Sequence, residues 1–238
     1  SKPTLSIGYF QRAKTISFEG IKKHDCDFVR RLTGGSAVLH ADELTYSLVI
    51  SENDPGIPKS VTKAYYVLTQ GVLEGYKNLG VEADFAIPER EIDNERSAIC
   101  FEKPSFYEML VDGKKICGNA QTRKRGVLLQ HGSLPISVDN DLLFDLFAFS
   151  SEEMRERRKA RFAGKATTIH EVTGKTFTYE EMVEAFKNGC AKGLGITLTP
   201  YELTDKQWAE VKHLAETKYA TEAWNMYTSK ERESIAKV

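Results

Sequence analysis

The chain has 238 residues, of which 41% are hydrophobic, and this is enough to build one large α/β domain with a sizeable core. Its 33 basic and 34 acidic residues give a formal net charge of −1, which argues against binding nucleic acid by neutralising phosphates. No apolar run reaches the roughly 18 residues needed to span a bilayer, and the first residues lack the apolar core of a signal peptide, so we expect a cytoplasmic protein without membrane contact.

The first fifty residues predict four short strands. The first alternates between apolar and polar residues, and the last is rich in β-branched and aromatic residues. Gly34 and Gly35 lie between the second and the third, so a turn is predicted there. The predicted strands cover residues 4–9, 28–31, 37–39 and 45–51.

A long helix is predicted after the break at residues 54–58. Ser60 is a suitable N-cap, and apolar residues recur at three- and four-residue spacing from Val61 to Leu79. Gly80 follows at the position where a glycine commonly ends a helix.

Residues 98–138 predict a run of strands, in which Asp112 and Gly113 form a hairpin turn and residues 127–131 form a strand. From Asp141 onward the pattern becomes helical.

Within that helical part, residues 155–161 are strongly basic, as on a solvated helix face, and capping-box sequences begin two further helices at Thr178 and Thr204. We therefore expect residues 1–150 to form a β-rich core and residues 151–238 to form the helical remainder of the same single domain.

The four cysteines lie far apart, and neither a CxxC pair nor a histidine cluster has zinc spacing. We expect reduced thiols and no metal site. Cys100 lies between Ile99 and Phe101, near the strand end that Pro104 predicts. Two interpretations remain open for it: a small buried hydrophobe, or a nucleophile that forms a thioester.

Two adjacent lysines follow the Asp-Gly turn. Because side chains alternate along a strand, Lys114 and Lys115 should point to opposite faces, so one of them can enter a pocket. A lysine there can polarise an acyl carbonyl or stabilise an oxyanion. Gly118, Asn119 and Ala120 are small enough to leave room for a ligand chain, although a tight bulge is the alternative.

A second candidate segment is residues 30–40. Arg30 and Arg31 supply donors for carbonyl, carboxylate or phosphate oxygens, and the glycine pair allows the backbone to approach a ligand. A surface strand with a hairpin turn is the alternative. His40 and His131 each end a predicted strand, where a histidine has either a structural or a functional role.

Together these segments resemble the lipoate-protein ligase and octanoyltransferase family. The family pattern R-R-x-[ST]-G-G-x-[AG]-V-x-H matches residues 30–40, and G-[RK]-K-[IV]-x-G-[SN]-A-Q matches residues 113–121. An H-G pair follows at residues 131–132, and weaker matches lie at residues 9–11 and 218–225. The resemblance implies an α/β (α+β) fold in which a mixed β-sheet is flanked by helices, as in biotin and lipoate ligase catalytic domains.

Residues 100–108 have the form C-F-x-x-P-S-x-Y-E, which resembles the branch that transfers octanoyl groups through a cysteine thioester. ATP-dependent lipoate ligases carry a G-R-N-D segment there, and this chain lacks it. Ser36 stands where ligases have a third glycine, and Ala41 replaces the usual aspartate. Family members also have a further N-terminal segment, which we expect to be absent here.

The resemblance thus implies an octanoyltransferase in protein lipoylation. Cys100 would take the octanoyl group from acyl carrier protein and pass it to a lysine of a lipoyl domain or of the glycine cleavage H protein, and Lys115 would stabilise the oxyanion. The implied substrate-binding residues are Arg30, Arg31, Thr33, Gly34, Gly35, His40, Gly118, Asn119, Ala120 and His131.

The implied reaction requires no cofactor. Two alternatives remain: an ATP-dependent ligase that forms a lipoyl-adenylate with Mg²⁺ and places Lys115 on the phosphate, and a non-catalytic protein that binds acyl groups or docks carriers.

Overall fold

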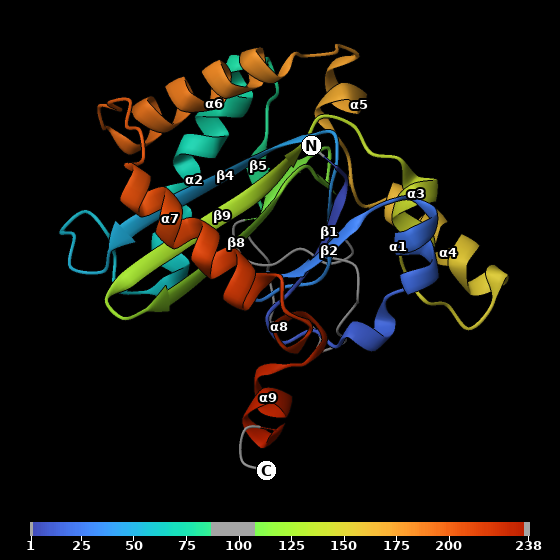
Figure 1. The fold of residues 1–238 in the computed structure, drawn as a ribbon. Helices are drawn as coiled ribbons and strands as arrows, with labels where there is room; N and C mark the ends of the chain where they lie inside the picture. Colours follow the sequence, from blue (N-terminus) through green and yellow to red (C-terminus); the bar gives the residue numbers. More distant parts are fainter. Residues whose placement is uncertain (1, 87–107, 236–238) are drawn as a thin grey trace.

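The computed structural model describes residues 2–86 and 108–235. Figure 1 shows the strands at the centre of the molecule and the helices around them. The described strands form three sheets of three strands each, with the orders β2-β1-β3, β4-β9-β8 and β5-β6-β7. This mixed α/β arrangement is the fold class that the sequence predicts.

The first sheet is mixed. β1 (Thr4–Ile7) lies between the parallel strand β2 (Asp27–Arg30) and the antiparallel strand β3 (Val38–His40). The Gly34–Gly35 turn therefore does not join a hairpin, since both flanking strands pair with β1 instead. A short 3₁₀-helix (Ala13–Thr15) and helix α1 (Phe18–Lys23), neither of which was expected, connect β1 to β2.

The strand predicted over residues 4–9 ends at Ile7, two residues early. The reason is a close backbone approach: a Cβ on Gly8 would lie only 1.9 Å from the carbonyl oxygen of Gly35. Gly8 thus brings the end of β1 against the glycine turn, and the chain bends away after it.

The second sheet is antiparallel, with β9 (Val127–Pro135) between β4 (Glu43–Ser51) and β8 (Gly118–Lys124). The strands predicted over 45–51 and 127–131 are confirmed and extend further. Their apolar face supplies Leu44, Leu48 and Leu128 to the core.

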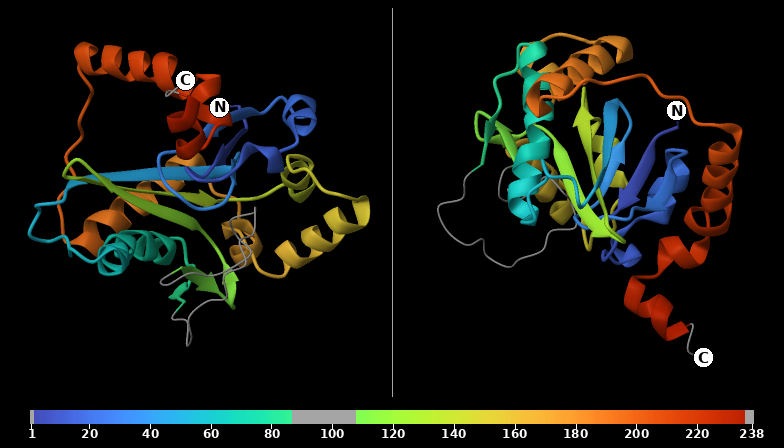
Figure 2. Two further views of the ribbon diagram at one scale, coloured as in Figure 1. Left: turned by 90° about the horizontal axis from the view of Figure 1, so that it is seen from below. Right: turned by 90° about the vertical axis from the view of Figure 1, so that its left-hand side faces the viewer.

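Helices α2 (Val61–Asn78) and α6 (Tyr179–Leu194) cover that face and lie side by side (Figures 1 and 2). Glycines permit their close contact, because a Cβ on Gly189 would be 2.2 Å from the backbone nitrogen of Gly75. The predicted long helix is confirmed, with Ser60 as its N-cap and Gly80 at a φ of 77° beyond its end.

The third sheet contains β5 (Asp84–Phe85), β6 (Met109–Val111) and β7 (Lys114–Lys115). The predicted hairpin turn is confirmed, since Asp112 and Gly113 have φ angles of 49° and 75°, as in a type I′ turn. The first part of the strand region predicted over 98–138, which includes Cys100, lies outside the described residues.

In the C-terminal part, the predicted capping boxes are present at Thr178 and Thr204. Figure 2 shows α7 on the side of the second sheet opposite α2. Val183 of α6 and Trp208 of α7 are exposed. The remaining helices are α3 (Asn140–Asp145), α4 (Glu152–Ala163), α5 (Ile169–Thr173), α7 (Asp205–Leu214), a π-helical turn (Ala215–Tyr219), α8 (Glu222–Met226) and α9 (Ser229–Ile235).

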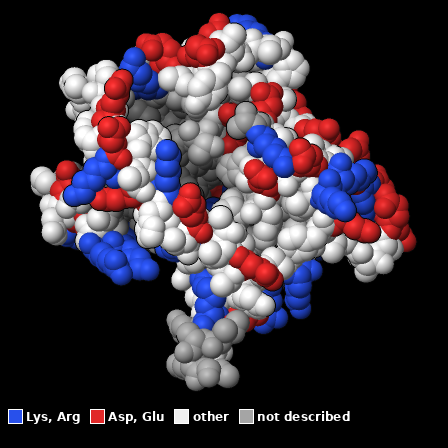
Figure 3. Space-filling model, in the orientation of Figure 1, with Lys and Arg blue, Asp and Glu red and all other residues white. Residues whose placement is uncertain are grey.

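The basic stretch lies on α4, where acidic side chains balance part of it. Arg155 contacts Asp145 at 2.7 Å and Glu152 at 3.0 Å, and Lys159 pairs with Asp141. Figure 3 shows basic and acidic side chains interspersed over this part of the surface, at the right. The predicted solvated helix face is confirmed. None of the described helices is both long enough and apolar enough to cross a membrane.

Candidate active site

A pocket lies between the first and the second sheet, and we call it the central pocket. Strands β1, β3, β4, β8 and β9 and the glycine turn all contribute to its wall. Seven of the ten residues predicted to bind substrate line it: Arg31, Gly35, His40, Gly118, Asn119, Ala120 and His131. Segments that are about 80 residues apart in the sequence therefore meet here.

Arg31 shapes one wall of the central pocket by holding the glycine turn. Its guanidinium donates hydrogen bonds to the carbonyl oxygens of Gly34, at 2.8 Å, and of Ser36, at 2.7 Å. Gly35 has a φ of 93°, which a residue with a side chain rarely adopts. The turn is therefore fixed from below by a charged side chain and needs glycine at this position.

Thr33, Gly34 and Arg30 do not line the central pocket. Thr33 is buried beneath the turn, with its hydroxyl 2.6 Å from Nε2 of His131. Arg30 is fully buried outside the central pocket, and its guanidinium donates hydrogen bonds to backbone carbonyl oxygens. We therefore assign Arg30 to holding the fold together rather than to contact with a ligand.

A chain of hydrogen bonds leads from the central pocket into its wall through His40. Nδ1 of His40 lies 2.6 Å from Oε1 of Glu43, and Nε2 lies 2.8 Å from the hydroxyl of Ser6. Burial alone would raise the pKa of Glu43, but hydrogen bonds from His40, Ser133 and Thr45 bring it below its ordinary value. The ionised carboxylate therefore accepts from Nδ1 and fixes the orientation of the ring.

His131, across the central pocket, has no carboxylate partner among the described residues. Burial, together with the nearby charge of Arg31, lowers its pKa to about 4. The ring is therefore neutral at pH 7 and contributes a hydrogen bond to Thr33 rather than a charge.

This lowered pKa predicts a loss of stability in mild acid. As the pH falls from about 6.5 to 4, His131 becomes protonated in the unfolded chain but stays neutral in the folded chain. The free energy of unfolding is therefore highest above pH 6.5 and decreases as the pH falls. Allowing for partial solvent access, we expect about 1 kcal/mol of this loss between pH 7.5 and pH 5.

Urea unfolding at both pH values checks this expectation. His131→Gln should lose less stability than the parent on acidification, whereas His170→Gln, at an exposed histidine, should behave like the parent. Equal losses in all three proteins would contradict the assignment.

Lys115 is buried and does not line the central pocket. Its ammonium pairs with the carboxylate of Glu108, and the two side chains are only 5% and 9% exposed. The preceding residue, Lys114, is partly exposed, as alternation along the strand predicts. Glu108 is the last residue of the C-F-x-x-P-S-x-Y-E segment, so this ion pair connects that segment to the lysine motif. Cys100 itself lies outside the described residues.

The other three cysteines are poor nucleophiles. Burial raises the pKa of Cys117 to about 11. The pKa values of Cys26 and Cys190 are also raised, chiefly by burial. A thiolate is the reactive form, so none of these three thiols is activated at neutral pH. In the part of the chain that the structure describes, no cluster of His, Cys, Asp or Glu is arranged to hold a metal ion.

Comparison with known proteins identifies the family. Residues 1–191 match the model of the lipoyl protein ligase A/B catalytic domain. The chain belongs to this family. Octanoyltransferase LipM of Bacillus anthracis is 51% identical over 229 residues, which cover 94% of this chain and 82% of that protein. Octanoyltransferase LipM of Bacillus subtilis is 50% identical over 228 residues, which cover 93% and 82%.

Solved structures of this family share the fold. A bipartite lipoate protein ligase from Thermoplasma acidophilum superposes with a TM-score of 0.76 at 24% identity and covers 94% of this chain and 80% of its own. LipL1 of Plasmodium falciparum, solved with lipoate, gives a TM-score of 0.61 at 18% identity, covering 95% and 59%. The chain therefore has the lipoate ligase fold that the resemblance implies.

Sequence reasoning did not select Ser6, Glu43 or Glu108 as site residues. Glu43 had a local signal, because it follows His40 by three residues. Glu108 stood in a recognised motif without a role. Ser6 had no signal at all, since it meets His40 only because β1 pairs with β3.

Proposed function

We propose that this chain is an octanoyltransferase of protein lipoylation. It moves an octanoyl group from acyl carrier protein to a lysine of a lipoyl domain or of the glycine cleavage H protein. The observation that carries the proposal is identity of about 50% to octanoyltransferases over more than nine-tenths of the chain. The absence of activated thiols among Cys26, Cys117 and Cys190 supports Cys100 as the nucleophile.

The reaction has two halves. In the first, the Cys100 thiolate attacks the thioester carbonyl of the octanoyl carrier, a new C–S bond forms, and the carrier thiol leaves. In the second, a neutral lysine amine attacks the Cys100 thioester, an amide forms, and the amine proton returns the cysteine to its thiol. Atoms balance without ATP, a metal or another cofactor.

Glycine and alanine leave space in the central pocket between Arg31, His40 and Asn119, and this volume of about 50 Å³ holds part of the acyl chain. Burying seven methylene or methyl groups is worth about 5 kcal/mol at roughly 0.8 kcal/mol per group. Binding energy of this size holds the uncharged tail without a charged anchor.

Lys115 stabilises the oxyanion of each tetrahedral intermediate in this proposal. Replacing it with methionine keeps the length of the side chain but removes the charge, so we expect kcat/KM to fall about 10²-fold. Lys114→Met is the matched control, because alternation along the strand points the Lys114 side chain to the opposite face from Lys115. This variant should change kcat/KM by less than about threefold. Equal effects of both variants, measured as octanoyl transfer to a lipoyl domain, would remove Lys115 from the mechanism.

The direct test of the function is the intact mass of the protein after incubation with octanoyl-acyl carrier protein in the absence of ATP. We expect a gain of one octanoyl group, located on Cys100 by peptide mapping. No gain in the folded protein, combined with release of AMP from ATP and free lipoate, would establish the ATP-dependent ligase instead. Carrier binding with neither reaction would indicate a non-catalytic docking protein.

A further inference from the structure

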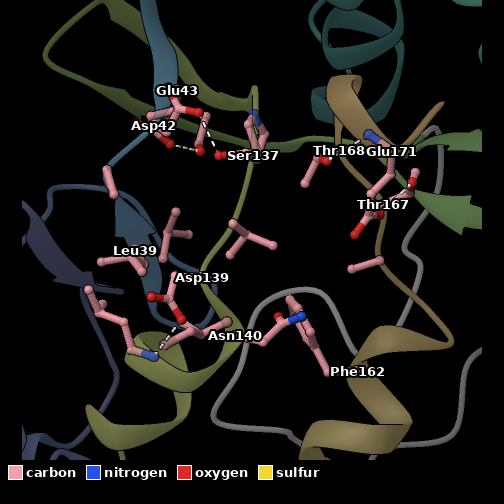
Figure 4. Close-up of a pocket in the computed structure, with 18 of the residues that line it drawn as sticks. Leu39, Asp42, Glu43, Ser137, Asp139, Asn140, Phe162, Thr167, Thr168 and Glu171 are labelled. Atoms are coloured by element: carbon pink, nitrogen blue, oxygen red, sulfur yellow. Dashed lines mark hydrogen bonds between the residues drawn. The ribbon is translucent and has the colours of Figure 1, made fainter. Parts of the chain in front are cut away.

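A second cavity, which we call the acidic cavity, adjoins the central pocket. The two share a wall formed by Val38 and Ser133. Its volume is about 160 Å³, and it is surrounded by the end of β3, the segment between β9 and α3, the end of α4 and the start of α5 (Figure 4). Nothing in the reaction described above uses it.

Its lining combines an apolar wall with carboxylates. The apolar wall comes mainly from Leu39, Val138, Leu142, Leu143, Phe162 and Ala166. Asp42, Asp139 and Glu171 are exposed at the rim, while Glu43, with a side chain only 5% exposed, lies deeper in the lining. No lysine, arginine or histidine is among the described residues that line the cavity.

This combination selects a particular ligand chemistry. The three rim carboxylates, with no basic residue in the lining beside them, repel phosphates and other anions. A side chain that suits these carboxylates has an aliphatic stem and a cationic end.

We propose that the acidic cavity receives the side chain of the acceptor lysine, an inference that rests on the proposed function. A cavity of about 150 Å³ accommodates a benzene ring, with six heavy atoms, and a lysine side chain has five. The rim carboxylates attract the ammonium, the apolar wall covers the stem, and the amine reaches the wall shared with the central pocket.

A double-mutant cycle in binding tests this proposal without depending on catalysis. The unacylated chain and its Asp42→Asn/Glu171→Gln variant are each titrated with a lipoyl domain and with the same domain whose acceptor lysine is replaced by methionine. We expect the variant to bind the lysine-bearing domain about fivefold more weakly, and the methionine-bearing domain with the same affinity as the parent does. Additive effects, with no coupling between the two changes, would overturn the proposal.

The two half-reactions provide a second test. Ala163→Leu adds bulk at an exposed position on the cavity wall, so it should raise the KM for the acceptor domain about tenfold. The rate of acyl-enzyme formation from octanoyl-carrier protein should stay within about twofold of the parent. Slower acyl-enzyme formation would place the acyl chain in this cavity and overturn the proposal.

Glu184→Gln is the matched control for the charge change, because Glu184 is exposed on α6 away from the cavity. It should leave both the binding affinity and the acceptor KM unchanged. Failure of the parent protein to form any acyl-enzyme would count against the proposed function itself. The binding cycle would still decide whether the cavity takes the lysine.

Discussion

Cys100→Ser should lower octanoyl transfer by roughly 10⁴-fold or more, because a serine hydroxyl is a far weaker nucleophile than a thiolate at neutral pH. The protein should no longer gain the mass of an octanoyl group from octanoyl-acyl carrier protein. Urea unfolding should show nearly unchanged stability, since the substitution exchanges one small side chain for another. Loss of transfer without loss of stability separates a chemical role from the structural one that the sequence left open.

Cys190→Ser and Cys26→Ser are the matched controls for this experiment. Burial raises the pKa of both thiols, so neither supplies a thiolate, and both variants should retain full transferase activity. A Cys100→Ser protein that still forms a thioester on another cysteine would contradict the mechanism. Cys117 is the residue to inspect in that case, because it lies two residues from Lys115.

The elements that the sequence predicted well are those with local causes. The long helix α2 has a serine cap, a regular apolar spacing and a glycine beyond its end, and all three signals lie within twenty or so residues. The capping boxes at Thr178 and Thr204 each need only four consecutive residues, and the Asp112-Gly113 turn needs two. Such signals depend little on the rest of the fold.

The central pocket was predictable in part for a different reason. Its residues stand in motifs that resemble those of a known family, and the structure brings most of them to one place. The hydrogen bond between Ser6 and His40 and the acidic cavity had no comparable signal, since both arise from segments far apart in the sequence. The division into residues 1–150 and 151–238 stays a prediction.

Arg30 shows most clearly what the sequence could not reveal. In the sequence it stands beside Arg31 as a second candidate donor for a ligand. In the structure its guanidinium donates to the carbonyl oxygens of Gly8, Tyr9 and Gln11 on one side. On the other side it donates to carbonyl oxygens of Trp224 and Asn225, about 195 positions later. Only the fold brings these five oxygens together.

Arg30→Met should therefore destabilise the protein by about 4 kcal/mol, because it leaves several buried carbonyl oxygens without a donor. The backbone bonds of Arg30 to the Asn225 side chain and from the Trp224 indole survive the substitution, so the measured loss reports on the guanidinium. Urea unfolding gives the free energy directly. Arg30→Lys should recover less than half of it, since an ammonium has three donors and cannot reach five oxygens.

Arg123→Met is the matched control, because Arg123 also donates to two carbonyl oxygens, those of Pro58 and Lys59, but near the surface. Water replaces the lost donor there, and the loss should be about 1 kcal/mol or less. Equal losses for both arginines would show that the hydrogen bonds from the Arg30 guanidinium to carbonyl oxygens contribute no more to stability than a surface contact.

The same hydrogen bonds hold the Gly8–Gln11 segment against the glycine turn. Arg30→Met should therefore also slow acyl-enzyme formation at urea concentrations below its unfolding transition.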